Sequence, residues 1–377
     1  MKKVIVFGGG TGLSCLLSGL KLFPVEVTTV ITVSDNGSST GVLKQEFDIP
    51  AVGDVGKVLL SMANVDDDFV KLLRYRFHRE GSSLDNHPVR NILLTALIDL
   101  KGNLTEATRY MSRLLNIKGE VLPLLEERVE LVGRDEAGNA EFYGEEDVSR
   151  NIRSIASLAY DHDVHVGKRV REKIGDADLI IFSPGSLYTS ILPHLIVDDV
   201  VEAIRNSGAP IMYVSNLVTQ PGETDGYNVS DHLRVLNSYL QGGSGLAGRA
   251  GRESTEGSSG PEESSGPERR DGRESGCSGL QGSSGPERCD GRADGCSGPR
   301  ERKVDIVVAN NAEIAPEITE KYLRTEQKTL VRLDREKIAA QGARIMEGDI
   351  FELDEEGRIR HNALRTAYMI FSWLMEG

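Results

Sequence analysis

Short apolar segments alternate with helical patterns along most of the chain, and this alternation limits the fold more than any other feature. The strand-like segments are rich in β-branched residues and occupy residues 4–7, 25–33, 177–183, 210–216, 304–310 and 328–333. Helical spacing of apolar residues is found at 13–22, 91–100, 104–116, 186–205, 229–240 and 363–375. Strands that alternate with helices form a parallel sheet covered on both faces. We therefore expect a Rossmann-like, doubly wound α/β fold with a mostly parallel sheet and helices on both faces.

Residues 242–303 differ in composition from the rest of the chain. They hold 16 of the 41 glycines and no Val, Ile, Phe, Tyr, Trp or Met. The segment SSGPERRDGRESGCSG at 264–279 returns as SSGPERCDGRADGCSG at 283–298, without the apolar face that a solenoid repeat needs. Such a segment cannot bury enough apolar area to offset the entropy cost of ordering. We expect a low-complexity disordered insert within one nucleotide-binding domain formed by residues 1–241 plus 304–377.

Composition narrows the class of protein. The net charge of −14 argues against a nucleic-acid partner, and no apolar run approaches the roughly 20 residues of a membrane span. Lys2 and Lys3 precede only four apolar residues before glycine, too few for a signal peptide, so we expect a cytoplasmic protein. Cys277, Cys289 and Cys296 lack the paired C-x-x-C spacing of a metal site, and the four cysteines of the chain make no disulfide framework.

The first strand runs directly into a glycine-rich turn, in the sequence VIVFGGGTGLSCLL at 4–17. Glycine accepts positive φ and lets a ligand approach the main chain. A helix that starts here would aim its first N–H groups at one point, which suits a phosphate, and Thr11 is a plausible N-cap. The phosphate-binding candidates are Gly8, Gly9, Gly10, Thr11 and Gly12, with a tight turn that binds nothing as the alternative.

The loop after the second strand reads SDNGSSTGVLKQEF at 34–47. Asp35 lies 23 residues after Gly12, about where a dinucleotide fold places the carboxylate that accepts a ribose hydroxyl. Asn36 and Ser38 extend a polar turn beside it, although an ordinary Asx turn would look the same. Asp54 precedes a further helix, and the sequence leaves open whether it caps that helix or binds a ligand.

Two later loops repeat the pattern of polar groups after a strand. The segment SPGSLYTSILPHL at 183–195 combines a Pro-Gly turn with hydroxyl groups that can donate to phosphate or sugar oxygens. The long loop NLVTQPGETDGYNVSDHL at 216–233 could close over a ligand, or be a plain surface loop. The candidates from these loops are Gly185, Ser186, Tyr188, Thr189, Asn216, Thr219 and Gln220.

Three features lie outside these loops. The cluster DHDVH at 161–165 could place carboxylates and imidazoles on one strand face, but we expect a solvated loop rather than a metal site. Arg360 precedes the last helix, for which Asn362 is a good N-cap, and it could donate to a diphosphate. Tyr322 could stack on a base. A surface charge pair and a core aromatic are the alternatives for these two residues.

In this order, the segments GGGTGLSCLLSGLK, SDNGSSTGVLKQEF, SPGSLYTSILPHL and NLVTQPGETDGY resemble the YvcK family of gluconeogenesis factors, relatives of the 2-phospho-L-lactate transferase CofD. The resemblance covers residues 1–241 and 304–377. It implies a cytoplasmic protein that binds a UDP-sugar such as UDP-N-acetylglucosamine and is needed for cell shape and for growth on gluconeogenic carbon sources. Arg360 and Tyr322 match positions of the UDP-sugar site in that family. The sequence SPGSLYTSI at 183–191 favours this branch over the transferase branch, which typically reads G-P-S-N-P-x-x-S-I.

The chain departs from the family pattern at three positions. Asn36 replaces a carboxylate, which weakens any metal site in this loop. Gly56 stands where the family has an arginine, and Arg90 stands where it has a glycine. Arg90 is a candidate to supply the lost charge, but the sequence alone does not show whether the two positions meet.

The sequence therefore predicts a nucleotide-sugar-binding regulator rather than an enzyme, with no required cofactor and no assigned catalytic residue. One alternative is a CofD-like transferase that moves a phospho-acid group from a nucleotide-linked donor. Another is an NAD-binding oxidoreductase, since NAD could occupy the same crevice. Homo-oligomer formation and protein partners are left open.

Overall fold

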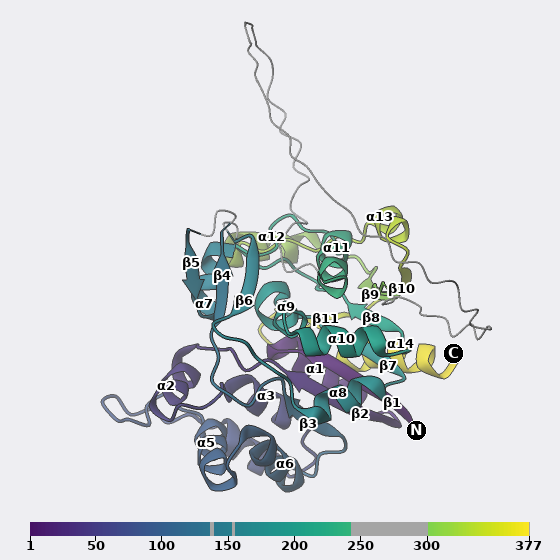
Figure 1. Ribbon diagram of the computed structural model, residues 1–377. Coiled ribbons are helices and arrows are strands. Elements are labelled where there is room, and N and C mark those ends of the chain that lie inside the picture. Colours follow the sequence, from purple (N-terminus) through teal and green to yellow (C-terminus); the bar gives the residue numbers. More distant parts are fainter. Residues whose placement is uncertain (136–138, 153–154, 243–300, 377) are drawn as a thin grey trace, which may run out of the picture. The chain divides into compact units, whose positions relative to one another are not determined.

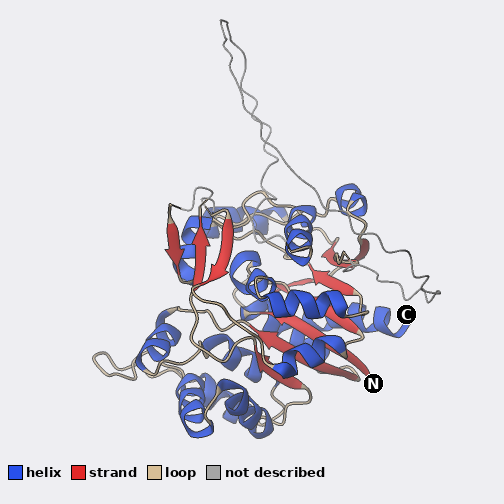
Figure 2. Ribbon diagram, in the orientation of Figure 1, coloured by secondary structure: helices blue, strands red, loops and turns tan. Residues whose placement is uncertain are grey.

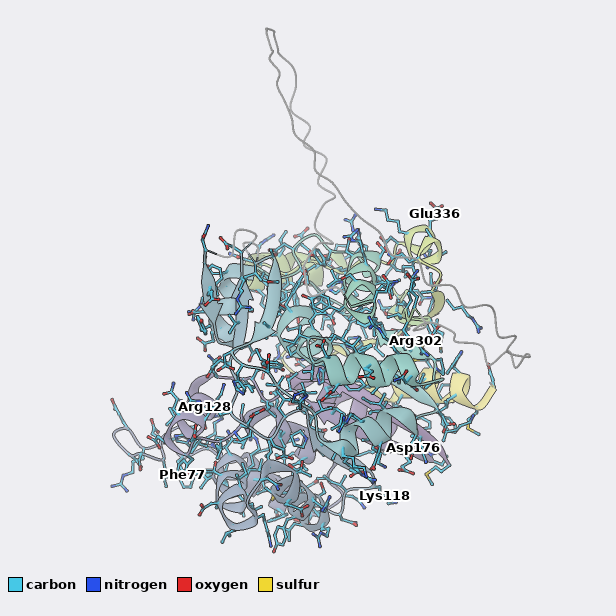
Figure 3. The ribbon with its side chains drawn as sticks, viewed as in Figure 1. Phe77, Lys118, Arg128, Asp176, Arg302 and Glu336 are labelled. Carbon is cyan, nitrogen blue, oxygen red and sulfur yellow. The ribbon has the colours of Figure 1, made fainter. Side chains whose placement is uncertain are left out.

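The computed structural model describes residues 1–135, 139–152, 155–242 and 301–376, with Ser38 described in its backbone alone. The predicted low-complexity insert falls, apart from its margins, on 243–300 and so lies outside the described residues. At its margin, the Arg302 guanidinium donates to the carbonyl oxygens of Ser207, at 2.5 Å, and Ala209 (Figure 3).

Seven parallel strands form the main sheet, in the order β10-β9-β8-β7-β1-β2-β3 (Figure 1). The predicted α/β fold with a parallel sheet is confirmed. The strands are β1 (Lys2–Gly8), β2 (Val25–Ile31), β3 (Glu120–Pro123), β7 (Leu179–Phe182), β8 (Ile211–Val214), β9 (Ile306–Asn310) and β10 (Arg344–Gly348).

The strand order reverses between β1 and β7. From β1 the chain moves outward through β2 to β3, whereas from β7 it moves the other way through β8 and β9 to β10. Val4 of β1 lies in register with Val27 on one side and Leu179 on the other. The carboxyl ends of β1 and β7 therefore flank a topological switch point, where α/β proteins bind their ligands.

Helices cover both faces of the sheet (Figure 2). α1 packs against α3 and α14, and α8 packs against α10; Leu13, Leu16, Leu17 and Leu20 form the buried stripe of α1. The helical segments are α1 (Gly10–Leu20), α2 (Ser38–Glu46), α3 (Gly53–Met62), α4 (Asp67–Arg74), α5 (Val89–Lys101), α6 (Leu104–Leu114), α7 (Glu145–Asn151), α8 (Lys168–Gly175), η2 (Leu187–Ile191), α9 (Leu192–Leu195), α10 (Asp198–Asn206), α11 (Val229–Leu240), α12 (Pro316–Glu326), α13 (Arg335–Ala340) and α14 (Ala363–Glu376). No helix in the described ranges is both long and apolar enough to cross a membrane.

Two small antiparallel sheets accompany the main one. β4 (Leu131–Arg134) pairs with β5 (Glu141–Tyr143) and β6 (Ser157–Tyr160), and β11 (Phe351–Leu353) pairs with β12 (Ile359–His361). The sequence analysis did not identify these strands, because segments of three or four residues carry too little periodicity to stand out.

Two predicted elements need correction. Residues 328–333 were predicted as a strand but form no strand of the main sheet. They lie alongside the 217–219 loop, where Val331 N–H donates to Leu217 O at 3.0 Å. The strand beside β9 is β10. The helix predicted at 186–205 is divided into η2, α9 and α10, with Pro193 near the start of α9, where its missing N–H costs no bond. Residues 161–165 form a loop, as expected.

Candidate functional site

A cavity of about 370 Å³ lies at the switch point, beyond the carboxyl ends of β1 and β7. Most of the residues predicted from the sequence line it. They are Gly9, Gly10, Thr11, Gly12, Asp35, Gly185, Ser186, Asn216, Thr219, Gln220 and Arg360. Segments far apart in the sequence therefore converge on one crevice, as the strand alternation predicted.

The glycine turn after β1 is held by close packing of its backbone. Helix α1 begins at Gly10 with Gly9 as its N-cap, so Thr11 lies inside the helix and its predicted capping role is wrong. Gly10 has a φ of +65°, and a Cβ there would have space around it. A Cβ on Gly12 would lie 2.1 Å from the Pro184 carbonyl oxygen, so only glycine lets the two turns meet.

The Asp54 carboxylate, which lies on α3, bonds the first N–H group of α1, as the side chain of an N-cap residue would. Its Oδ2 accepts the Gly10 N–H at 2.7 Å, and its Oδ1 accepts from Lys57 Nζ at 2.8 Å. The N-cap of its own helix, α3, is Val52, so Asp54 is not that N-cap. A carboxylate at the start of α1 is favoured by the helix dipole, and it already fills one position that a phosphate would use.

The second turn, after β7, is held by a side chain. Asn216 Oδ1 accepts the Gly185 N–H at 2.9 Å, and Asn216 Nδ2 donates to Gly185 O at 2.7 Å. Ser186 is the N-cap of η2, and its hydroxyl donates to Glu223 Oε2 at 2.6 Å. Burial raises the pKa of Glu223, while donation from the Ser149 and Ser186 hydroxyls opposes that change.

Three carboxylates line the crevice near the first turn: Asp35, Asp54 and Glu145. Burial and then the charge of Asp54 raise the pKa of Asp35. Burial, followed by the charges of Asp35 and Asp54, raises the pKa of Glu145 to about 8. Like charges that share a buried site disfavour ionisation, so the Glu145 carboxyl holds its proton near neutral pH. Within the described ranges no cluster of metal-ligating side chains has the arrangement of a metal site.

Two cations line the crevice beside the loop after β8. Lys328 Nζ lies 2.6 Å from Glu326 Oε2, and Arg360 Nε donates to Asp354 Oδ2 at 3.2 Å. Lys328 precedes Thr329, whose N–H donates to Thr219 Oγ1 at 2.9 Å. Arg360 lies on β12, and Asn362 caps the next helix by accepting the Arg365 N–H at 2.9 Å, as the sequence predicted.

Several predicted site residues lie elsewhere. Tyr188 is fully buried, with its hydroxyl 2.8 Å from the Tyr227 hydroxyl, and Thr189 donates to Ser186 Oγ at 2.7 Å. The buried Tyr322 hydroxyl accepts the Ile359 N–H, so its ring is not offered to a base. The remaining two do not line the cavity: Gly8, which packs against Ser183, and Asn36, which packs against Gly144. The side chain of Ser38 lies outside the described residues.

Sequence reasoning missed Glu145, Lys57, Lys328 and Cys15 as lining residues. Glu145 starts α7, beside a small sheet that the sequence did not reveal. Lys57 lies three residues after Asp54 on α3. This spacing is typical of an ion pair on a helix, and it was the one sequence signal for Lys57. Cys15 donates to His361 O at 3.0 Å, and burial raises the pKa of its thiol to about 11, so it is protonated at neutral pH.

The two departures at positions 56 and 90 do meet. A Cβ on Gly56 would lie 3.1 Å from Arg90 Cδ and 3.3 Å from its Cγ. The Arg90 side chain thus occupies the space over Gly56, next to Lys57 on α3.

The fold and the crevice define a Rossmann-like protein whose site lies at the switch point of a parallel sheet. The chain belongs to the CofD family, since the family model described as 2-phospho-L-lactate transferase CofD matches residues 4–351. A relative from Thermotoga maritima is 45% identical over 240 residues, 63% of this chain and 76% of its own length. The Bacillus subtilis protein named gluconeogenesis factor is 38% identical over 239 residues, 63% of this chain and 75% of its own length. A crystal structure of a Bacillus halodurans protein shares the fold with a TM-score of 0.77, at 31% identity and 98% and 99% coverage of the two chains.

Proposed function

We propose that this protein binds a nucleotide sugar of the UDP-N-acetylglucosamine type in the crevice and acts as a cytoplasmic gluconeogenesis factor. The observation that supports this is the convergence of two glycine turns, the 216–220 loop and Arg360 on one polar cavity. The gluconeogenesis-factor names of its relatives support the regulatory role. In this role the protein supports cell shape and growth on gluconeogenic carbon sources, and it does so by binding rather than by catalysis.

The charges of the crevice suggest how the ligand lies. Carboxylates accept hydrogen bonds from sugar hydroxyls, whereas Arg and Lys side chains pair with phosphate groups. We therefore place the diphosphate beside Lys328 and Arg360, and the sugar hydroxyls toward Asp35 and Asp54. The Gly10 N–H is engaged by Asp54, so this arrangement moves the diphosphate away from the glycine turn, where the sequence had placed it.

A CofD-like transferase is the second candidate. The family model carries the transferase description, and the raised pKa of Glu145, about 8, would let its carboxyl exchange a proton near neutral pH. Incubation with UDP-sugars distinguishes the two: a binding protein leaves them intact. Steady release of UDP or a sugar phosphate, lost in the Glu145→Gln variant, would establish turnover instead.

Calorimetric titration with UDP-N-acetylglucosamine tests the binding proposal, with GDP and NAD as competing ligands. Arg360→Gln should weaken binding about tenfold or more, because a charge-assisted contact to phosphate is worth roughly 1.5–3 kcal/mol. Arg358→Gln is the matched control: Arg358 pairs with the same Asp354 but does not line the cavity, so it should change the affinity less than about twofold. Equal effects of the two changes, or tighter binding of GDP or NAD, would contradict the proposal.

A further inference from the structure

A second group of cations lies beside the crevice, where α3 meets α5. Gly56 sits inside α3, where a glycine destabilises the helix by about 1 kcal/mol relative to alanine. Its missing side chain makes room for Arg90, whose Cδ would lie 3.1 Å from a Cβ at position 56. Gly56 therefore lowers the stability of α3 and at the same time makes room for a buried arginine.

Arg90 is buried, and one nitrogen of its guanidinium group lacks a partner. The residue is 7% exposed, and its Nε has no hydrogen-bond acceptor among the residues that the structure describes. A buried charge normally requires a counter-ion and full hydrogen bonding. Across the described ranges, the Arg90 guanidinium takes part in no ion pair, which makes it an exception that calls for an explanation.

The charges around Arg90 do not neutralise it. Burial, followed by the positive charges of Arg76 and Arg74, lowers the pKa of Arg90 to about 10. Neither Arg74 nor Arg76 has an ion-pair partner among the residues that the structure describes. Asp54 does act on Arg90, but its oxygens are engaged by Lys57 at 2.8 Å and by the Gly10 N–H at 2.7 Å. In a chain of net charge −14, this is a local excess of positive charge.

The cluster is held in place by neighbouring contacts. Arg76 donates to Asn86 O at 2.7 Å and pairs with Pro88 in a short β-bridge, in the segment that Phe77 marks in Figure 3. Just before α5, His87 Nδ1 lies 2.8 Å from the buried Ser39 hydroxyl. The segment that carries Arg76 and Arg90 is therefore fixed before any ligand arrives.

We propose that Arg90, with Arg74 and Arg76, forms a subsite beside the crevice for the phosphate or carboxylate group of a second small ligand. An oxyanion would supply an acceptor to a buried guanidinium whose Nε has none among the described residues, and the planar donor fork of arginine matches such groups. The subsite is separate from the diphosphate position assigned to Lys328 and Arg360, so the protein would sense a small anion together with a nucleotide sugar.

Titration of the full chain with inorganic phosphate, at constant ionic strength, tests the subsite without any nucleotide sugar. Arg90→Met should weaken phosphate binding at least tenfold while the melting temperature stays the same or rises, because an unpartnered buried charge is removed. Arg90→Lys keeps the charge without the fork and should weaken binding less. Arg171→Gln, an exposed arginine on α8, is the matched control and should leave phosphate binding unchanged.

The remaining arms separate the sources of the anion. Acetate in place of phosphate distinguishes a carboxylate site from a phosphate site, since the preferred ligand class binds more tightly. Saturation with UDP-N-acetylglucosamine should leave phosphate binding intact. Phosphate binding that survives Arg90→Met, or that the nucleotide sugar abolishes, would overturn a separate subsite. A lower melting temperature in Arg90→Met with unchanged phosphate affinity would show a purely structural role.

Discussion

Two glycine turns follow the neighbouring strands β1 and β7, and they are built in different ways. The first, Gly9–Gly12, is fixed by backbone packing: a Cβ on Gly12 would lie 2.1 Å from Pro184 O. The second, Pro184–Ser186, is fixed by a side chain, since Asn216 bonds both the N–H and the carbonyl of Gly185. A Cβ on Gly185 would meet nothing closer than 3.6 Å.

This difference changes what the glycine in each turn indicates about ligand binding. In a strand–turn–helix motif, glycine suggests that a ligand approaches the main chain. Here Gly12 is needed because another turn approaches, and in both turns one N–H is already bonded, to Asp54 or to Asn216. The turns shape the crevice, and the side chains around them are left to select the ligand.

Gly12→Ala should give the largest effect. The new methyl group meets backbone atoms, Pro184 O at 2.1 Å and Pro184 C at 2.7 Å, which cannot rotate away. We expect a loss of about 3 kcal/mol in the free energy of unfolding, the upper range for overpacking, measured by urea denaturation. Gly10→Ala is the control within the same turn: its Cβ would meet only Asp54 Oδ2, at the ordinary contact distance of 3.9 Å, but the residue keeps a positive φ, so the change should cost only about 1–2 kcal/mol. A smaller loss for Gly12→Ala than for Gly10→Ala would refute the packing argument.

Asn216→Ala should have the next largest effect, on the second turn. It removes two hydrogen bonds, of 2.9 and 2.7 Å, so that the N–H and the carbonyl oxygen of Gly185 must bond to water instead. The expected loss is about 2 kcal/mol, in line with unsatisfied backbone groups that are partly solvated. Asn216→Asp keeps the acceptor for the Gly185 N–H and should lose less. If urea denaturation gives no difference between wild type and Asn216→Ala, the side chain does not hold the turn.

The carboxylates around the first turn should make stability depend on pH through Glu145. Its pKa is raised to about 8 in the folded protein, so the folded state binds a proton that the unfolded state releases above its ordinary pKa of about 4.3. Stability is therefore highest at low pH in this window and falls as pH rises toward 8. We expect the difference between wild type and Glu145→Gln to change by about 1 kcal/mol between pH 5 and pH 8, since partial exposure screens the burial cost. Parallel curves for the two proteins would contradict the assignment.

The sequence predicted five strands of the main sheet, β1, β2, β7, β8 and β9, because they read as apolar runs, as in Leu179–Phe182 and Ile211–Val214, which is typical of strands buried on both faces. It missed β3, which has only four residues, and β10, whose residues are partly or fully exposed. It misplaced residues 328–333, whose β-branched character suits a bridge to the 217–219 loop as well as a sheet strand. It placed Tyr188 in the site for its hydroxyl and Tyr322 for its ring, because neither group reveals in the sequence whether it is buried or offered to a ligand. It could not find Glu145, since the acidic start of α7 resembles any solvated helix.

Gly185→Ala should have the smallest effect, and it is the direct counterpart of Gly12→Ala. The nearest atoms to a Cβ on Gly185 are Gly9 O and Ser190 Cβ, both at the ordinary contact distance of 3.6 Å. Gly185 has no positive φ, so alanine fits its backbone and also restricts the unfolded chain. The free energy of unfolding should change by less than about 0.5 kcal/mol, or rise slightly, as for other compatible Gly→Ala changes. Urea denaturation beside Gly12→Ala measures the contrast. A loss above about 1 kcal/mol in Gly185→Ala would mean that the second turn also depends on close backbone packing, and the two turns would then be alike.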